Sequence, residues 1–289
     1  MKVTLLTTTY NAAETLGRTL RSVVDQAELP DELVIIDDGS EDDSLRVAET
    51  FEDELPLRIV SAGRIGRAAS LNRGVLEANG DIIAILDADD IAFPWRIETQ
   101  RRAFEESERL GIHGSSYLVI RTDDGGPDVT LRTPPPEDRA IRRALAFSGP
   151  FCHSSVAYRK AALDEVGGFD ETLTTQIDQD VWVRIASAGW ELRNERRPHA
   201  VHLKSPSTYF SKLNTRYHRA RTMYARNLAA VKTLDLGVTG HMAAGARLAL
   251  NAAPLAVVQS FNSSDSSVEE LLGVGLTTQD VDWAVREYS

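Results

Sequence analysis

The sequence predicts an α/β fold with a doubly wound, mostly parallel sheet that is flanked by helices. Two observations carry this prediction. Short continuous apolar runs recur along the first third of the chain, and such runs are typical of strands that are buried on both faces. Between them lie segments in which the apolar residues recur at helical spacing. An alternation of strands with helices implies parallel strands joined by helical crossovers.

The first third of the chain supplies most of the expected sheet. Strands are expected at residues 3–10, 32–40, 57–62 and 81–90, and helices at residues 11–26, about 42–51 and 67–80. Asn11 with Glu14 has the pattern of a capping box for the first helix. Ser40 or Asp42 is expected to cap the second helix, and Gly80 to close the third.

The remainder of the chain is less regular. An amphipathic helix is expected to start at Pro94, and residues 125–140, which are rich in glycine and proline, suggest a surface loop or hinge. The stretch "DQDVWVRIASAG" predicts a helix with Val181, Trp182 and Ile185 inward. Residues from about 211 onward have a helical pattern, interrupted by "NSSDSS".

Composition limits the classes of function. The single cysteine, Cys152, excludes an internal disulfide framework and a cysteine-rich zinc site, and it fits a reducing compartment. A net charge of −11 argues against non-specific binding to nucleic acid. The amino terminus has too short an apolar run for a signal peptide, and no run reaches the length of a membrane-spanning helix. We therefore expect a cytoplasmic protein.

Three polar clusters follow the expected strands. They lie at residues 8–11, 37–40 and 87–90. Ligands of open α/β sheets bind outside the carboxyl ends of the strands, near a switch in strand order. Because this fold gathers the three clusters along one edge, the sequence predicts a ligand site there.

The cluster at residues 87–90 places three carboxylates after a buried strand. Asp87 and Asp89 either form a solvated acidic turn or hold a divalent cation that bridges the phosphates of a nucleotide. Hard oxygen ligands suit Mg²⁺ or Mn²⁺, which typically take one or two carboxylates together with substrate phosphates. A cation would offset the mutual repulsion of the acids.

The other clusters allow two interpretations as well. Asp37 and Asp38 suit a simple turn in which Gly39 supplies a positive φ, although a carboxylate at a strand end can also accept hydrogen bonds from a base or a ribose. Tyr10 either packs against the fold or stacks on a base. Arg64 and Arg67 are candidate phosphate partners or ordinary surface charges.

Five stretches occur in the order seen in family 2 glycosyltransferases. They are "TTTYNAAETLGRTLRSVVDQ", "LVIIDDGSEDDS", "SLNRGVLEANGDIIAILDADDIAFPWRIETQ", "HSSVAYRKAALDEVGGFDE" and "DQDVWVRIA". The chain resembles that family over about residues 1–210. The resemblance implies a GT-A fold and an inverting enzyme, with a nucleotide-sugar-binding half at 1–100 and an acceptor-side half at 101–210. Residues 211–289 would form a helical C-terminal extension.

The resemblance implies roles for the acidic edge. Thr8, Tyr10 and Asp38 would hold the base and ribose of a nucleotide-sugar, and Arg67 is a further candidate for donor binding. Asp87 and Asp89 would form the D-x-D motif, with Asp89 as the direct metal ligand. His202 resembles a histidine that completes the metal or diphosphate site, and the alternative is a surface histidine.

The resemblance also implies roles for the second half. Gly168, Phe169 and Asp170 match a loop that borders the donor sugar and the acceptor. Asp178 matches the general base, although Ile177 stands where glutamate is common in the family. Asp178 would equally suit a helix N-cap, and a register shift would place the base at Asp180.

Together these features predict an inverting, metal-dependent glycosyltransferase. It would use a nucleoside-diphosphate sugar, with UDP favoured, Mn²⁺ or Mg²⁺, and a hydroxyl acceptor such as a polyprenyl-linked or cell-surface glycan. The basic stretch "NTRYHRARTMYARN" is either a solvated helix face or a peripheral contact with the inner face of the membrane. The alternatives are a nucleotidyltransferase on a similar core and a catalytically inactive nucleotide-binding protein.

Overall fold

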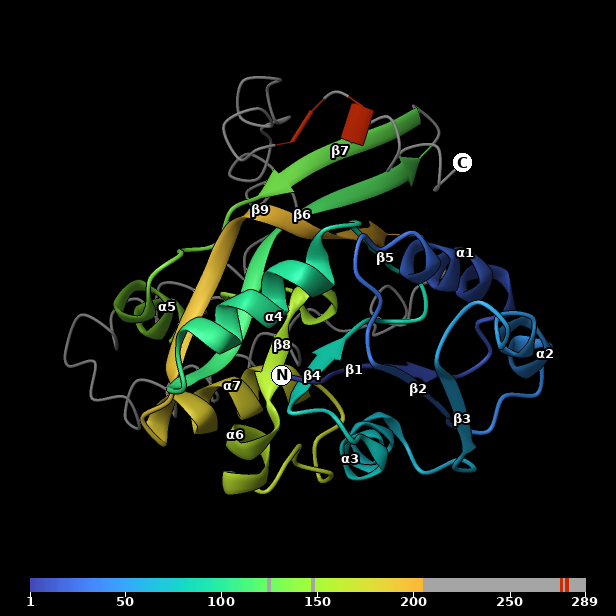
Figure 1. The fold of residues 1–289 in the computed structure, drawn as a ribbon, viewed down its shortest axis with the longest axis horizontal. Coiled ribbons are helices and arrows are strands. Elements are labelled where there is room, and N and C mark those ends of the chain that lie inside the picture. The colour runs from blue at the N-terminus through green and yellow to red at the C-terminus, as the bar shows by residue number, and fades with distance from the viewer. Residues whose placement is uncertain (124–125, 147–148, 205–275, 278, 281–289) are drawn as a thin grey trace, which may run out of the picture.

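The parallel sheet expected from the first third of the chain forms one end of a larger mixed sheet. In this computed structural model, residues 1–123, 126–146, 149–204, 276–277 and 279–280 are described. Within them the strand order is β3-β2-β1-β4-β8-β6-β9-β5, and β7 pairs with β6 (Figure 1). The expected helical extension, its basic stretch at 214–227 and the "NSSDSS" loop lie outside the described residues.

The first seven elements alternate as the sequence predicts. They are β1 (Val3–Thr9), α1 (Ala13–Val24), β2 (Glu32–Asp37), α2 (Ser44–Glu49), β3 (Leu57–Ser61), α3 (Arg67–Glu77) and β4 (Ile82–Ile85). The pairs β2–β3, β1–β2 and β1–β4 are all parallel. The carboxyl ends of these strands therefore lie at one edge of the sheet, as expected.

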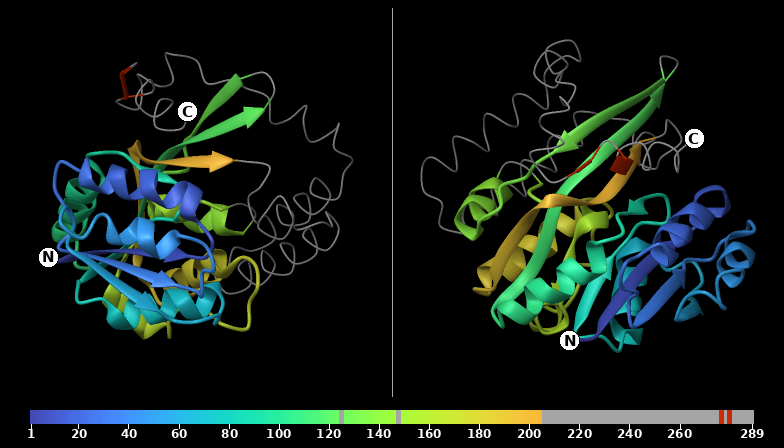
Figure 2. Two further views of the ribbon diagram at one scale, coloured as in Figure 1. Left: turned by 90° about the vertical axis from the view of Figure 1, so that its right-hand side faces the viewer. Right: turned by 45° about the horizontal axis from the view of Figure 1, so that its top comes forward.

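The second half extends the sheet with strands of both directions. Its elements are β5 (Ile91–Ala92), α4 (Arg96–Glu106), β6 (Leu110–Asp123), β7 (Gly126–Arg132), α5 (Asp138–Leu145), η1 (His153–Ser155), β8 (Ala157–Arg159), α6 (Lys160–Glu165), α7 (Ile177–Ser187) and β9 (Glu191–Lys204). β8 runs antiparallel to β4 and to β6, whereas β6 and β9 are parallel. The strands β6 and β7 form a ribbon that projects beyond the helices (Figure 2).

Helices cover both faces of the sheet. On one face α1, α2 and α4 pack against the strands through residues such as Leu20, Ala48 and Phe104. On the other face α3, α5, α6 and α7 pack through residues such as Leu71 and Trp182. Because both faces of the central strands are covered, those strands read as continuous apolar runs. Among the described residues, no helix has both the length and the apolar character needed to cross a bilayer.

The predicted capping box of the first helix is wrong, because Ala12 precedes α1 and caps it with no side-chain bond, whereas Asp42 does accept the N–H of Ser44, the first residue of α2, at 3.0 Å. Asn11 has a φ of 49°, and its side-chain oxygen accepts a hydrogen bond from the backbone N–H of Glu41 at 2.8 Å. The Ser40 hydroxyl accepts from Asn11 N–H at 3.0 Å, and the Asp42 carboxylate accepts from Ala13 N–H at 3.0 Å. Asp42 therefore bonds to the first residue of α1 as well as to the first residue of α2, and a local sequence pattern cannot reveal the bond to α1.

Two further expectations are corrected. Gly80 does not close α3, because the helix ends before Ala78, which has an extended backbone. Gly80 instead allows a close approach, since a Cβ there would lie 2.6 Å from the Thr4 nitrogen. The predicted loop at 125–140 contains β7, whose Val129 and Leu131 pack against an apolar cluster that includes Ile120 and Leu203.

A buried polar cluster lies behind the acidic edge. His113 on β6 and His199 on β9 are buried, with ring centroids 5.7 Å apart. Burial, followed by the charges of Arg193 and Arg96, lowers the pKa of His113 to about 3, and burial lowers the pKa of His199 as well. Arg96 is fully buried and donates to the Ile85 carbonyl at 2.6 Å.

Because these histidines are buried in their neutral form, we expect the free energy of unfolding to decrease in acid. An unfolded histidine has a pKa of about 6.5. Below this pH the unfolded chain therefore binds a proton at His113 that the folded chain does not bind. The stabilising contribution is fully present above this value and is lost as the pH falls toward the folded pKa of about 3. We expect His113→Leu to remove up to about 1.4 kcal/mol per pH unit from the slope of unfolding free energy between about pH 6 and pH 4, measured by urea unfolding. An unchanged slope would contradict the assignment.

Candidate active site

The carboxyl ends of β1, β2 and β4 carry the three predicted polar clusters. Thr9 at the end of β1 pairs in register with Asp37 at the end of β2, and β4 lies on the other side of β1. Thr8 is half-buried near the end of β1. Asp37 accepts hydrogen bonds from the N–H groups of Gly39 and Ser40, so it holds the turn that follows β2.

Asp87 is paired with the first residue of α3. Arg67 Nη2 lies 2.7 Å from Asp87 Oδ1. Burial favours the neutral carboxyl, but the charge of Arg67, followed by that of His153, outweighs burial and holds the pKa of Asp87 at about 2. The backbone N–H of Asp87 also donates to Ser154 Oγ at 3.2 Å. Asp87 is therefore an ionised carboxylate in a fixed position.

The pKa of Asp89 is shifted in the opposite direction from that of Asp87. Burial, followed by the negative charges of Asp90 and Asp87, raises the pKa of Asp89 to about 7. No described residue forms an ion pair with it. A carboxyl that is destabilised by two neighbouring carboxylates is a strong site for an added cation, because the cation relieves the repulsion.

Asp90 holds His202. The Asp90 side chain is fully buried, and its two oxygens lie 3.2 and 3.1 Å from His202 Nδ1. One of these oxygens also accepts from the backbone N–H of Leu203 at 2.9 Å. The charge of Asp90 raises the pKa of His202 against the effect of burial. With Nδ1 engaged, the other ring nitrogen is the one free to bind a ligand or metal, as in carboxylate–histidine–metal groups.

These residues fit a divalent cation that is completed by a ligand. Among the described residues, no group of three or more histidine, cysteine, aspartate or glutamate side chains is arranged to hold a metal ion. Asp89 and His202 offer one carboxylate and one imidazole, and the remaining positions would fall to water or phosphate oxygens. This number of protein ligands is usual where a metal binds together with a nucleotide.

Arg64 contacts Tyr10 and Asp38, two of the residues expected to bind the base and ribose. Its guanidinium carbon lies 3.3 Å from the centroid of the Tyr10 ring, and its Nη1 lies 3.0 Å from Asp38 Oδ2. The other oxygen of Asp38 accepts from the N–H groups of Ile65 and Gly66, both at 2.8 Å. Tyr10 and Asp38 are thus brought together, and Arg64 is more than an ordinary surface charge.

Asp178 and Asp180 differ in their surroundings. Asp178 is the second residue of α7, and the residue that precedes the helix, Gln176, has a φ of 58°, so the N-cap interpretation of Asp178 is wrong. The charge of Asp178 contributes to the raised pKa of Arg67, after the charge of Asp87, so Asp178 lies within electrostatic range of the Asp87–Arg67 pair. Asp180 pairs instead with Arg184 at 2.8 Å.

The loop at 166–171 contains the predicted Gly168 and Asp170. Gly168 has a φ of 71°, and Asp170 Oδ1 accepts from the N–H and the hydroxyl of Thr172 at 2.9 and 2.7 Å. Asn72 of α3 contacts this loop and was missed by the sequence analysis, because a polar residue inside a helix gives no signal of what it touches.

His153 is the second residue that the sequence analysis missed. Both of its ring nitrogens are buried without a hydrogen-bond partner among the described residues. Its sequence signal is weak, since it occurs only within a longer matching stretch. It shares its electrostatic environment with Asp87, Arg67 and Asp178. The site thus contains an imidazole whose hydrogen-bonding capacity is unmet.

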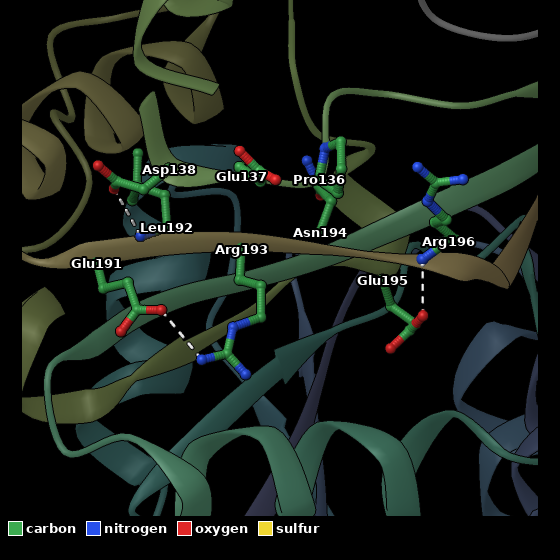
Figure 3. A pocket seen from close by; sticks show the side chains of 9 residues that line it. All are labelled: Pro136, Glu137, Asp138, Glu191, Leu192, Arg193, Asn194, Glu195 and Arg196. Atoms are coloured by element: carbon green, nitrogen blue, oxygen red, sulfur yellow. Dashed lines mark hydrogen bonds and ion pairs between the residues drawn. The ribbon is translucent and has the colours of Figure 1, made fainter. Parts of the chain in front are cut away.

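A separate hollow of about 410 Å³ lies between the start of α5 and the first half of β9 (Figure 3). Within it Arg193 pairs with Glu191 at 3.0 Å, and Asp138 accepts from Leu192 N–H at 3.0 Å. None of the predicted site residues lines it. The acidic edge, with its unbalanced charges, remains the candidate active site.

Comparison with known proteins gives consistent matches. A family model described as Glycosyl transferase family 2 matches residues 4–167. The putative glycosyltransferase EpsE of Bacillus subtilis (strain 168) is 31% identical over 195 residues, which cover 65% of this chain and 68% of EpsE.

Two solved structures resemble the fold. TarS 1–349 of S. aureus, in complex with UDP-GlcNAc, gives a TM-score of 0.61 at 17% identity and covers 99% of this chain and 79% of that chain. The mannosyltransferase PcManGT of Pyrobaculum calidifontis, in complex with GDP-Man and Mn²⁺, gives a TM-score of 0.59 at 21% identity. The match covers 99% of this chain and 84% of PcManGT. At these identities the likeness shows the fold alone, which is consistent with the predicted GT-A fold.

Gly39 offers a test of how the edge is held together. Its φ is 80°, and a Cβ there would lie 3.2 Å from the Arg64 nitrogen. We expect Gly39→Ala to lower the free energy of unfolding by about 1–2 kcal/mol, because an L side chain is strained in this region. Gly17, within α1, is the matched control, since its Cβ would make an ordinary contact at 3.5 Å with Val47. Gly17→Ala should stabilise by about 0.5–1 kcal/mol. Equal effects in urea unfolding would contradict this account.

Proposed function

Because the chain belongs to glycosyl transferase family 2, we propose that it transfers a sugar from a nucleoside-diphosphate sugar to a hydroxyl acceptor, with inversion at the anomeric carbon. The observation that carries this proposal is the acidic edge. There Arg67 pairs with Asp87, Asp89 has no cationic partner among the described residues, and Asp178 lies within electrostatic range of Arg67. This edge suits a ligand that brings both a metal and a diphosphate.

The donor would bind across the ends of β1 and β2. Tyr10 offers a ring for stacking on the base, Asp38 offers carboxylate oxygens, and Thr8 lies on the adjoining strand. Arg67 would lie near the diphosphate. Complexes of TarS with UDP-GlcNAc and of PcManGT with GDP-Man support a nucleoside-diphosphate sugar as the donor class. We propose UDP as the favoured nucleotide.

Asp89 and His202 would hold Mn²⁺ or Mg²⁺. The bound cation would supply positive charge that offsets the charge on the leaving diphosphate. Asp90 orients the His202 ring through Nδ1, and Arg67 keeps Asp87 ionised beside the site. The Mn²⁺ complex of PcManGT supports a divalent metal for this fold.

Asp178 would act as the general base. Its carboxylate takes the proton of the acceptor hydroxyl as that oxygen attacks the anomeric carbon. A new carbon–oxygen bond forms on one face of the sugar while the bond to the diphosphate oxygen breaks on the other, so the configuration inverts. Asp178 accepts a hydrogen bond from the adjacent Gln179 N–H at 2.9 Å, whereas Asp180 forms an ion pair with Arg184.

The acceptor side would involve the loop with Gly168 and Asp170. We propose a polyprenyl-linked or cell-surface glycan as the acceptor. A peripheral contact of the C-terminal residues with the inner face of the membrane would bring the enzyme to such an acceptor, and those residues lie outside the described part of the chain.

The metal proposal is tested at Asp89. Asp89→Ala should abolish the Mn²⁺-dependent part of UDP or GDP binding, since it removes the carboxylate that would hold the cation. Asp43→Ala is a control, because Asp43 pairs with exposed Arg46 away from the site. Binding is measured by calorimetry with Mn²⁺ and with EDTA. Equal affinity of the unmutated protein under both conditions would exclude the metal.

The base is tested by two matched variants. Asp178→Asn keeps the size of the side chain but cannot take a proton, so the transfer rate should fall by about 10²–10⁴ while diphosphate binding is retained. Asp180→Asn weakens the pair with Arg184 and should reduce stability more than it reduces the rate. Both variants are compared by donor turnover and by thermal unfolding. If Asp180→Asn is inactive and Asp178→Asn is fully active, the base is Asp180.

A further inference from the structure

The side-chain amide of Asn72 forms three hydrogen bonds with the loop at 166–171. Its Oδ1 accepts from the backbone N–H of Phe169 at 2.7 Å. Its Nδ2 donates to the Phe169 carbonyl and to Glu171 Oε1, each at 2.8 Å. The amide therefore pairs with the N–H and the carbonyl of a single residue, as a neighbouring strand would.

Only an asparagine meets these demands at position 72. Aspartate has the same shape but cannot donate, and it would face the carboxylate of Glu171. Alanine would leave both backbone groups of Phe169 without this partner. A longer glutamine would extend into the loop, where a Cβ on Gly168 would already lie 2.5 Å from Asn72 Oδ1. The absence of a side chain at Gly168 makes room for Asn72.

The opposite side of the same loop is held by α7. Arg184 donates to the carbonyls of Val166 and Gly168 at 2.6 and 2.7 Å, and Asp180 orients it at 2.8 Å. Two glycines in the loop, Gly167 and Gly168, have positive φ values of 76° and 71°. The N–H groups of Gly167 and Gly168 donate to carbonyls of α6 at 3.2 and 2.9 Å, and the ring of Phe169 is buried beside Tyr158. The side chains of Asn72 and Arg184 add contacts from α3 and α7 to this anchored loop.

Asn72 shares a helix with the partner of the D-x-D motif. Arg67 begins α3 and pairs with Asp87 at 2.7 Å. The five residue steps from Arg67 to Asn72 span about 7.5 Å along a rigid helix. The helix α3 thus acts as a spacer between the acidic edge and the loop at 166–171.

We propose that Asn72 is a positioning residue that fixes the loop at 166–171 relative to the Asp87–Arg67 pair, so that the sugar of the donor is held between them. This inference rests on the proposed glycosyl transfer. In this proposal α3 sets the distance between the loop at 166–171 and the Asp87–Arg67 pair, where the sugar ring would lie. A shift of the loop would misplace the sugar without disturbing the diphosphate, because the residues proposed to bind the diphosphate are not on the loop.

The test compares Asn72→Asp and Asn72→Ala with Asn79→Ala. Asn79 is the matched control, since its side-chain amide lies just beyond the same helix and donates to Glu32 at 2.9 Å, away from the loop. We expect the kcat for hydrolysis of UDP-GlcNAc or GDP-mannose with Mn²⁺ to fall about 10- to 100-fold in both Asn72 variants. The Kd values for UDP and GDP should stay within about twofold, because only the loop is displaced. Asn79→Ala should leave kcat unchanged.

Hydrogen exchange supplies a readout that needs no activity. The amide of Phe169 should lose protection in Asn72→Ala, which removes its acceptor, and keep it in Asn79→Ala. In Asn72→Asp the acceptor remains, so that variant tests only the bonds that the Asn72 amide donates. Full protection of the Phe169 amide in Asn72→Ala would overturn the inference, as would an unchanged kcat or a loss of UDP and GDP binding as large as the loss in kcat. If the unmutated protein neither binds nor hydrolyses any of these nucleotides, the proposed function fails, and the exchange result then decides separately whether Asn72 holds the loop.

Discussion

The mutual repulsion of three carboxylates at the end of β4 is the constraint around which the site is organised. The negative charge of Asp87 is balanced by the ion pair with Arg67. Asp90 accepts hydrogen bonds from His202 and from a backbone N–H. Among the described residues Asp89 has neither kind of partner, and burial, followed by the charges of Asp90 and Asp87, raises its pKa to about 7. The fold thus stabilises two of the acids and leaves the third available, which creates a local demand for positive charge in a protein that is acidic overall.

Much of this arrangement could be predicted from the sequence, because it follows from short-range patterns. The apolar runs and helical spacings gave the order of elements through β4, and the rule for parallel sheets placed residues 8–11, 37–40 and 87–90 at one edge. The family resemblance extended the same argument to α7. The second half of the sheet was less predictable, since β7 lies in a stretch rich in glycine and proline.

The remaining features depend on contacts between residues that are far apart in the chain. The N–H groups of Ala12 and Ala13 at the start of α1 donate to Ser44 and Asp42, which a pattern within one helix does not show. Asn72 reaches across 97 positions to Phe169. His153 was missed for the same reason, because its importance lies in what surrounds the ring and not in its sequence neighbours.

The contact of Arg64 with Tyr10 and Asp38 has a consequence for affinity. The guanidinium covers the aromatic face and pairs with the carboxylate, so a base that binds there as proposed would have to displace Arg64. The affinity for that base would then be a difference between two stacks and two sets of hydrogen bonds. Such an exchange would keep the dissociation constant moderate even with good final contacts, and a moderate constant would favour rapid release of a spent nucleotide.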